Sequence, residues 1–140
     1  MGQRNKWRQI MPQFGNKSLE NLNQCHPDLI LLFNEVIKHF DCTVTCGHRG
    51  EFEQNEAFRK GYSKLKFPMS KHNNDPALAA DVVPYPIDWK DTERMYCFGG
   101  FVKGIASQMG IDIRWGGDWD SDTQVKDQNF IDLPHFELIV

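Results

Sequence analysis

The sequence predicts an α+β fold in which helices pack on a small, mostly antiparallel sheet. A length of 140 residues suits one domain. Apolar residues make up 40% and aromatic residues 12% of the chain, which is ordinary for a protein with a core. Helix-like and strand-like segments do not alternate regularly, which favours α+β over a parallel α/β sheet. No repeat or linker interrupts the chain, so we expect one domain over residues 1–140, with residues 1–40 as an N-terminal lead-in and packing helix.

Charge and hydropathy exclude two classes of function. A net charge of -3 argues against binding nucleic acid through its phosphates. The longest clear apolar run, Leu29–Phe33, is far shorter than the roughly 18 residues of a membrane span. The basic start Met1–Arg8 is not followed by an apolar block, so no secretion signal is expected and the chain should be cytoplasmic when synthesised.

The first regular elements are a helix and a strand. Pro27 suits the first position of a helix, which Asp41 ends. Cys42–Cys46 has the composition of a short strand. The apolar stripe that predicts the helix has the spacing of one buried face: Leu29, Leu32, Phe33, Val36, Ile37 and Phe40.

The middle of the chain predicts a polar helix and a buried strand. After a turn at 47–50, a helix should span about Phe52–Lys60 and close at Gly61. Residues 62–74 are loop-like, and Ala79–Val83 is apolar enough for a buried strand.

The last third predicts one long helix and two strands. Asp91 is placed to cap a helix that runs to about Met109. Strands are expected at Ile111–Trp115 and His135–Val140, separated by a loop rich in Asp and Gly. The inner face of the helix is predicted from its spacing: Met95, Phe98, Val102, Ile105 and Met109.

We expect the four cysteines to be small buried thiols with no role in catalysis or metal binding: Cys25, Cys42, Cys46 and Cys97. His26 and His39 lie at the ends of the first helix and suit capping and the helix dipole, respectively.

Two other histidines keep company with carboxylates. His72 lies in a loop, and Asp81 follows nine positions later inside the apolar strand. A carboxylate there must be paired or bound to a metal if it is buried. His135 has an acid three residues before it and another two residues after it. Two imidazoles and a carboxylate form a common ligand set for catalytic zinc, and a structural ion pair is the alternative.

These segments resemble the M15 family of zinc peptidoglycan peptidases. The resemblance rests on Ser70-x-His72 with Ala79-x-Asp81 and on Asp132-x-x-His135-Phe136-Glu137. Two further segments resemble family motifs: 46–54, which contains Arg49, and the glycine-tryptophan loop 115–119. Together they span Thr43 to Leu138 and imply a Hedgehog/DD-peptidase-like α+β fold. The interval of nine between His72 and Asp81 departs from the family's usual seven, and Asp75-Pro76 stands near the usual glycine.

The resemblance implies a role for each matching residue. His72, Asp81 and His135 would hold one zinc ion, and Asp132 would be the catalytic base. Glu137 is the rival base, although on an alternating strand it could instead hold the His135 imidazole in place. Arg49 would stabilise the substrate carbonyl or carboxylate; a surface ion pair with Glu51 or Glu53 is the alternative.

Two further substrate contacts are expected in the cleft. Ser70 would hydrogen-bond the substrate, as the resemblance implies. Trp115 is assigned to substrate binding because Trp115 and Trp119 flank a Gly-Gly turn and could wall a cleft. Asp118, Asp120 and Asp122 alternate as in a calcium loop, but without the full EF-hand pattern a solvated acidic loop is the expectation.

The implied activity is hydrolysis of the peptidoglycan stem peptide by a small phage endolysin, a zinc L-alanyl-D-glutamate endopeptidase. The enzyme should be a monomer that reaches the cell wall after release. A D-Ala-D-Ala carboxypeptidase or dipeptidase with the same metal site is the first alternative. A binding module that keeps the fold but does not cut belongs to another class and is the second.

Overall fold

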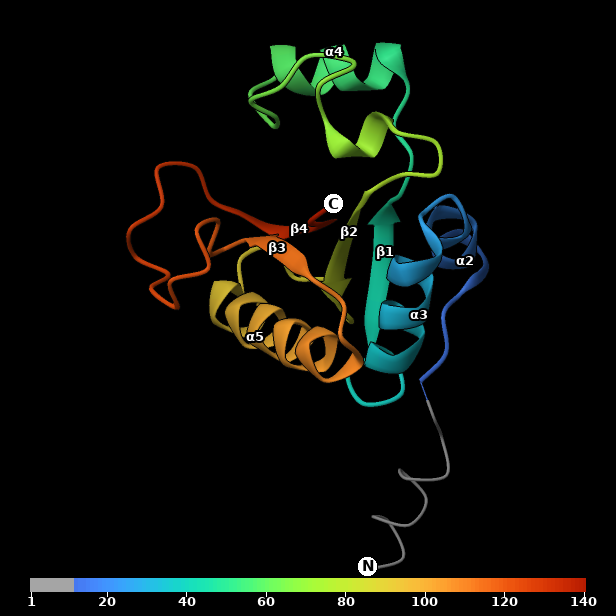
Figure 1. The fold of residues 1–140 in the computed structure, drawn as a ribbon, viewed down its shortest axis with the longest axis vertical. Helices are drawn as coiled ribbons and strands as arrows, with labels where there is room; N and C mark the ends of the chain where they lie inside the picture. The colour runs from blue at the N-terminus through green and yellow to red at the C-terminus, as the bar shows by residue number, and fades with distance from the viewer. Residues whose placement is uncertain (1–11) are drawn as a thin grey trace, which may run out of the picture.

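The computed structural model describes residues 12–140 and contains a four-stranded antiparallel sheet in the order β1-β2-β4-β3 (Figure 1). Residues 1–11, which include the whole basic start Met1–Arg8, lie outside the described residues, so the lead-in is described from residue 12 onward. The predicted α+β class is confirmed. The elements in chain order are α2 (Asn16–Asn23), α3 (Pro27–Val36), β1 (Cys42–Cys46), α4 (Glu51–Arg59), η1 (Lys71–Asn73), β2 (Ala79–Pro84), α5 (Thr92–Met109), β3 (Ile113–Gly116) and β4 (Asp132–Leu138).

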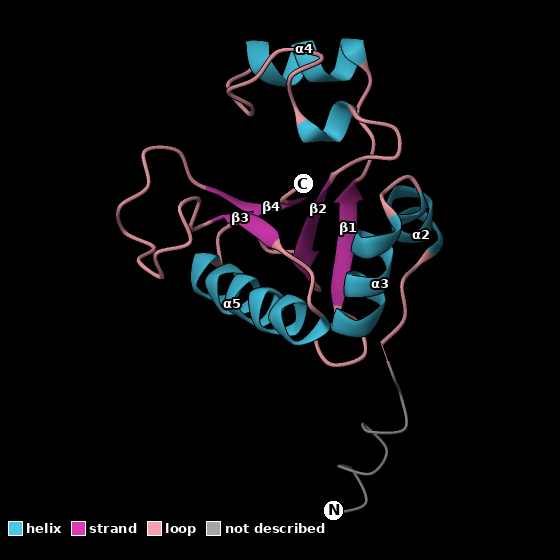
Figure 2. Cartoon of the chain, viewed as in Figure 1, coloured by secondary structure: helices cyan, strands magenta, loops and turns pink. Residues whose placement is uncertain are grey.

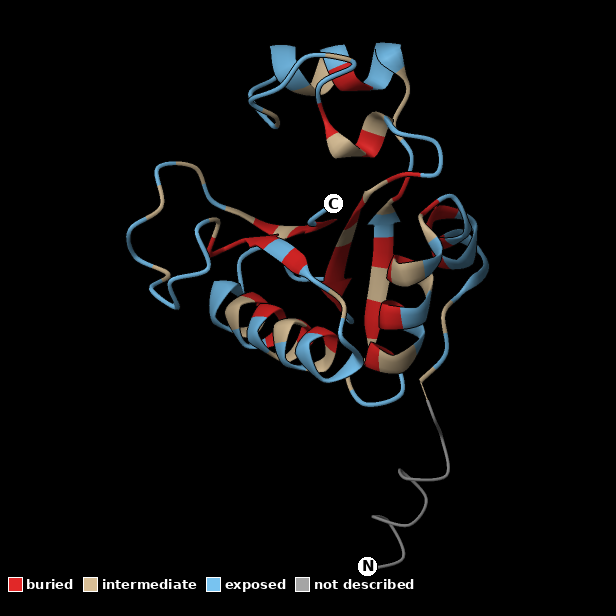
Figure 3. Ribbon diagram, viewed as in Figure 1, coloured by how far each residue is buried: buried red, intermediate tan, exposed pale blue. Residues whose placement is uncertain are grey.

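Two helices cover one face of the sheet and meet at a single aromatic side chain. Phe136 of β4 is fully buried, and its ring lies 5.6 Å from Phe33 of α3 and 6.0 Å from Phe98 of α5, both edge to face. Such aromatic pairs add to the free energy that burial of their area supplies. The buried residues therefore concentrate between these helices and the sheet (Figures 2 and 3).

The helix α3 begins as predicted and ends earlier. Pro27 is its first residue, and the His26 ring accepts a hydrogen bond from the backbone N–H of Asp28 at 3.0 Å. The α-helical part ends at Val36, followed by a turn, although the apolar stripe continues to Phe40. The Phe40 ring packs against Phe98 of α5 at 5.0 Å, so the stripe still marks the buried face.

The helix α2 was not predicted, because its buried face is largely polar and contributes one apolar residue, Leu22. Ser18 and Asn21 are buried, and both bond to the backbone of Val44 in β1. The Asn21 amide donates to the carbonyl oxygen of Val44 at 2.9 Å, and the Ser18 hydroxyl accepts from its N–H at 3.1 Å. These bonds satisfy backbone groups on the outer side of β1, which is an edge strand of the sheet that residues 12–140 form.

Register brings the polar residues of the sheet together. A bulge between Val44 and Cys46 in β1 breaks the strand alternation and sets Cys46 opposite Asp81 of β2. Asp81 in turn stands opposite His135 of β4. A second irregularity at the end of β3 pairs Gly116 with Asp132.

The segment between β1 and β2 lies beyond one end of the sheet. Figure 1 shows α4 and η1 past the point where β1 ends and β2 begins. Gly61 was predicted to end α4, and its left-handed backbone, with a φ of 82°, agrees with that prediction. Among residues 12–140, no helix combines the length and the apolar character that a membrane span requires.

Candidate metal and active site

A cleft of about 890 Å³ opens over the sheet beside β2 and β4. It contains all but one of the residues that the sequence assigned to a site; the exception is Trp115. Its walls come from the segment 62–72, from the strands and from the loop between β3 and β4. The lining residues are Arg49, Tyr62, Ser63, Lys64, Leu65, Met69, Ser70, Lys71, His72, Asp81, Trp89, Arg114, Trp119, Phe130, Asp132, His135 and Glu137.

Asp81 is the centre of the site. Its Oδ1 lies 3.1 Å from Nε2 of His72 and 3.4 Å from Nδ1 of His135. The two imidazole rings meet edge to face with centroids 5.1 Å apart. One nitrogen of each histidine therefore converges on a single carboxylate oxygen.

The orientation of His72 is fixed from its other ring nitrogen. Nδ1 lies 2.7 Å from the carbonyl oxygen of Gly47, so it carries the proton and Nε2 is free to face Asp81. The ring is almost fully buried. Its backbone is held by η1, whose first residue is capped by the Ser70 hydroxyl, an acceptor for the His72 N–H at 3.2 Å.

The orientation of His135 is fixed in the same way by Glu137. Nε2 lies 2.7 Å from Oε1 of Glu137, which leaves Nδ1 turned towards Asp81. The Glu137 carboxylate also accepts a hydrogen bond from Arg114 at 2.8 Å and lies 3.6 Å from the Lys71 ammonium. An acceptor on the distal nitrogen of an imidazole is the usual arrangement behind a metal-ligating histidine.

Electrostatics show how strongly these groups depend on one another. Burial opposes the charged form of His72, yet the Asp81 carboxylate raises the pKa of His72 to about 10. Burial likewise opposes the charged form of Asp81, but His72 and His135 hold the pKa of that carboxyl well below its usual range. The pocket is thus built around an anion that needs a cation beside it.

The donors present fit a zinc ion. Two imidazole nitrogens and one carboxylate oxygen converge, and each imidazole has its remaining nitrogen occupied, which is the ligand set of catalytic zinc sites with one open position. A second grouping places donor atoms of Cys46, His72 and Asp81 within 4.8 Å of one another. The Cys46 sulfur, however, lies 3.8 Å from Nδ1 of His72, the nitrogen that donates to Gly47. The first grouping therefore fits better.

Asp132 lines the cleft next to these three residues. Burial, and then the charge of Asp81, raise the pKa of Asp132 to about 6. Its backbone lies against Gly116, where a Cβ would collide with the carbonyl oxygen of Asp132. Glycine at 116 thus allows β3 to approach β4 at the position of the carboxylate.

Arg49 does not form the ion pair with Glu51 or Glu53 that was the alternative. Its guanidinium lies 3.4 Å from Oδ2 of Asp81 and donates to Oε1 of Gln54 at 3.0 Å. Gln54 is fully buried in α4, and it donates in turn to the hydroxyl of Ser63. Sequence reasoning gave Gln54 no role, although it ends the segment 46–54 that resembles a family motif.

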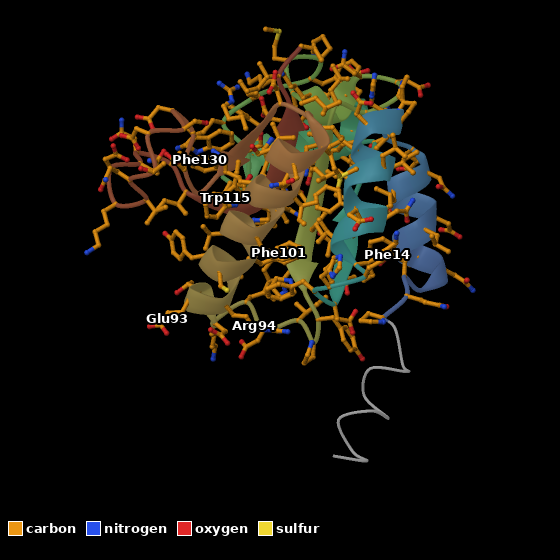
Figure 4. The ribbon with its side chains drawn as sticks, turned by 60° about the horizontal axis from the view of Figure 1, so that its bottom comes forward. Phe14, Glu93, Arg94, Phe101, Trp115 and Phe130 are labelled. Carbon is orange, nitrogen blue, oxygen red and sulfur yellow. The ribbon has the colours of Figure 1, made fainter. Side chains whose placement is uncertain are left out.

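Trp115 does not line the cleft, so its assignment to substrate binding is wrong. Trp115 is 3% exposed, and its indole donates to the carbonyl oxygen of Leu133 within the core. Figure 4 labels Trp115 next to α5, where Gly99 leaves room for the ring. Trp119, on the other side of the Gly-Gly turn, lines the cleft, and its ring lies 5.4 Å from that of His135.

Ser70 and the long interval between His72 and Asp81 both have a structural explanation. Ser70 is 5% exposed and lines the cleft, but its hydroxyl already accepts the His72 N–H. The loop after η1 folds back, and the backbone of Ala77 exchanges hydrogen bonds with Gln24 and His26. The nine-residue interval therefore ends with the two side chains in contact.

Comparisons with known proteins agree on one kind of enzyme. A family model described as phage L-alanyl-D-glutamate peptidase matches residues 10–139. Among solved structures, the L-Ala D-Glu endopeptidase ChiX of Serratia marcescens is similar, with a TM-score of 0.70 and 28% sequence identity. That match covers 91% of this chain and 90% of the other. No curated protein matches the chain.

Proposed function

Because the chain belongs to the phage L-alanyl-D-glutamate peptidase family, we propose that its activity depends on a zinc ion held by His72, Asp81 and His135. The chain is a peptidoglycan endopeptidase of the endolysin type. The bond cut is that between L-alanine and D-glutamate in the stem peptide. The assignment of individual residues goes beyond the comparisons and is argued from the geometry of the cleft.

One observation carries the metal assignment. Nε2 of His72 and Nδ1 of His135 both turn to Oδ1 of Asp81, while Gly47 and Glu137 hold the opposite nitrogens. A purely structural ion pair would need one histidine beside Asp81. A divalent ion would displace the proton from the nitrogen of each imidazole that faces Asp81, and Gly47 and Glu137 would then hold the neutral rings in the tautomer that a metal requires.

The chemistry divides between the ion and the side chains around it. Zinc, when bound, supplies a Lewis acid that polarises the peptide carbonyl and makes water acidic enough to attack at neutral pH. Asp132 takes the proton of the attacking water and returns it to the leaving amine. A pKa of about 6 leaves this carboxylate largely ionised at pH 7 and basic enough to accept a proton.

Asp132 suits the role of base better than Glu137. The hydrogen bond from His135, followed by that from Arg114, outweighs burial and lowers the pKa of Glu137 to about 2. A carboxylate engaged in this way is a weak base, and both of its oxygens are already in use. Glu137 therefore orients His135, and Asp132 moves the proton.

Arg49 is placed to hold the negatively charged part of the substrate. Its side chain is 18% exposed, lines the cleft and is oriented by Gln54. A guanidinium fixed in this way can stabilise the developing oxyanion of the peptide carbonyl or bind a carboxylate of the stem.

The test uses purified sacculi and the zinc-loaded chain. Digestion should expose new amino groups on D-glutamate, and removal of metal by chelation should stop it until zinc is restored. Release of D-alanine instead would establish D-Ala-D-Ala cleavage and contradict the proposal. Unchanged hydrolysis by protein shown by metal analysis to be zinc-free would contradict the role of the ion.

Variants test the residue roles separately from the fold. Asp132→Asn should retain one equivalent of zinc and lose hydrolysis, whereas His72→Ala should lose both. Asp112→Asn, which removes an exposed carboxylate outside the cleft, is the matched control and should retain both. Full hydrolysis by Asp132→Asn would overturn the assignment of the base. Absence of hydrolysis by the zinc-loaded wild type, with sacculi still bound, would favour a binding module.

A further inference from the structure

Two cations of the cleft share one carboxylate. Arg114 of β3 donates to Oε2 of Glu137 at 2.8 Å, and the Lys71 ammonium lies 3.6 Å from the same oxygen. Among residues 12–140, neither cation pairs with a second acid. The other oxygen of Glu137 faces His135, whose ring is neutral when it binds a metal. One negative charge thus meets two positive charges, which leaves a surplus positive charge beside the metal site.

The Arg114 guanidinium is held in place and still reaches the cleft. Glu137 fixes it from one side, and the ring of Trp119 lies against it, with the ring centroid 5.7 Å from Cζ. The side chain is 45% exposed and lines the cleft. The hydrogen bond that Arg114 makes within residues 12–140 uses Nη2, so the N–H groups of Nε and Nη1 remain for another acceptor. A fixed guanidinium with such donors suits a carboxylate ligand.

Arg49 and Arg114 lie on opposite sides of the proposed metal ligands. The sheet order β1-β2-β4-β3 puts β1 and β3 at its two edges (Figure 1). Arg49 follows β1 and contacts Asp81 of β2. Arg114 belongs to β3 and contacts Glu137 of β4. A substrate that crosses the metal site therefore meets one arginine on each side. Arg49, beside a metal ligand, suits the oxyanion, which leaves Arg114 for a charged group next to the reacting carbonyl.

The proposed substrate carries such a group on its leaving side. Cleavage between L-alanine and D-glutamate leaves the amino nitrogen on the α-carbon of D-glutamate. In the stem peptide, D-glutamate continues the chain through its γ-carboxyl. The carbon that bears the leaving nitrogen therefore also carries a free α-carboxylate. The α-amide of this residue, D-isoglutamine, has nearly the same shape but no charge, and one of its two polar atoms is a donor.

We propose that Arg114, assisted by Lys71, binds the α-carboxylate of D-glutamate next to the scissile bond, so that the enzyme prefers the free acid over its amide. This inference rests on the proposed function and adds a specificity-determining residue to it. The α-carboxylate keeps its charge throughout the reaction. Arg114 therefore binds the ground state and the transition state alike, and the preference should appear in KM more than in kcat.

Steady-state hydrolysis of two N-acetylmuramyl tripeptides tests the preference. One contains L-Ala-γ-D-Glu-L-Lys and the other contains D-isoglutamine in place of D-glutamate. With the zinc-loaded wild type, kcat/KM should be at least about tenfold higher for the acid, because the amide loses a charge-assisted pair. Hydrolysis of both at equal kcat/KM would overturn the preference and leave the proposed function intact. Hydrolysis of neither would contradict the proposed function and this inference with it.

Variants separate recognition by Arg114 from its support of Glu137. In Arg114→Gln the acid-to-amide ratio of kcat/KM should fall towards one, and Arg114→Lys, which keeps the charge but not the fork, should retain part of the preference. Arg59→Gln is the matched control and should leave the ratio unchanged, because Arg59 is exposed and pairs with Glu56 outside the cleft. An unchanged ratio in Arg114→Gln, with both rates lowered, would mean that Arg114 acts only through Glu137 and would overturn the proposal.

Binding without turnover gives a second readout. Calorimetric titration of zinc-loaded Asp132→Asn with each tripeptide should show at least about tenfold tighter binding of the acid. Adding Arg114→Gln to Asp132→Asn should make the two affinities equal. Zinc content should remain at one equivalent in both proteins, because Glu137 still holds His135. Equal binding of the two tripeptides by Asp132→Asn would overturn the proposal.

Discussion

The molecule holds two groups of carboxylates, one on the sheet and one on a loop, which differ in what faces them. On the sheet, Asp81 meets two histidines and Arg49, and Glu137 meets His135, Arg114 and Lys71. On the loop, the carboxylates lie close to one another and accept hydrogen bonds from backbone N–H groups; they belong to Asp118, Asp120 and Asp122.

The difference lies in what neutralises the negative charges. The sheet group is rigid because strand register and hydrogen bonds from neighbouring side chains fix each donor before an ion arrives. This arrangement suits zinc, whose geometry is strict. The carboxylates of the loop group face one another instead, so their mutual repulsion should lower the stability of the folded chain.

Removal of the central carboxylate should break the sheet group completely. Asp81→Asn deletes the charge on which His72 and His135 converge. Zinc should be lost. The rate of sacculus hydrolysis should fall by more than the roughly 10–100-fold expected when a hydrogen bond that orients a metal ligand is lost. Metal analysis and the release of D-glutamate amino groups measure the two effects. Retention of full zinc content would contradict the ligand assignment.

Loss of an outer partner should have a smaller effect. Glu137→Gln keeps the size of the side chain but weakens the hydrogen bond that orients His135. Zinc affinity should fall roughly 10–100-fold, measured by competition with a chromogenic chelator. Glu35→Gln in α3, whose carboxylate pairs with Lys38 and His39 outside the cleft, is the matched control and should leave zinc affinity unchanged. Equal affinity in Glu137→Gln would mean that His135 needs no such support.

Gly116 lies where the sheet and the loop join, and a side chain there should disturb both. In Gly116→Ala the Cβ would collide with the carbonyl oxygen of Asp132, so the free energy of unfolding should fall by about 1–3 kcal/mol. Gly104→Ala in α5 meets no atom within 4 Å and should instead raise it by about 0.5–1 kcal/mol. Chemical denaturation measures both, and a neutral Gly116→Ala would refute the close approach.

The pH dependence of stability sharpens the description of the sheet group. The pKa of Glu137 is about 2 in the folded chain, against an ordinary value of 4.5. Its contribution is therefore complete above pH 4.5 and is lost as the pH falls towards 2, because the unfolded chain binds the proton first. In the metal-free protein, the stability difference between wild type and Glu137→Gln should shrink over that range. A constant difference would contradict the assignment.

The smallest effect should come from the loop group. Asp120→Asn relieves repulsion among neighbouring carboxylates and should raise the thermal midpoint of unfolding slightly. Differential scanning calorimetry measures the midpoint. A lower midpoint in Asp120→Asn would contradict the expected repulsion.

Sequence reasoning was strongest where a local pattern carries the information. Strand β1 was predicted at its observed bounds, and the Asp91 cap of α5 was also located correctly. It failed for α2, because Ser18 and Asn21 are buried through hydrogen bonds to a strand more than twenty residues away. No apolar periodicity reports such a contact.

The same contrast between local patterns and long-range packing holds for the residues of the site. The residues placed in the cleft from short motifs lie there, including His72, Asp81 and Asp132. Trp115 was misplaced although it shares the buried face of β3 with Ile113, because its position beside a Gly-Gly turn was given more weight than strand alternation. Oδ1 of Asp118 is buried and has no hydrogen-bond partner among residues 12–140, which depends on packing and could not be read from the spacing of the aspartates.

The polar contacts of α2 also bear on how the protein behaves at high concentration. An edge strand with free backbone groups can pair with the edge of another molecule and start aggregation. Asn21 donates to the outward carbonyl of Val44, and Ser18 accepts from its N–H. These two backbone groups in the middle of β1 therefore cannot pair with a strand of another molecule. Helix α2, which the sequence pattern did not reveal, thus hinders sheet-to-sheet association between copies of the chain.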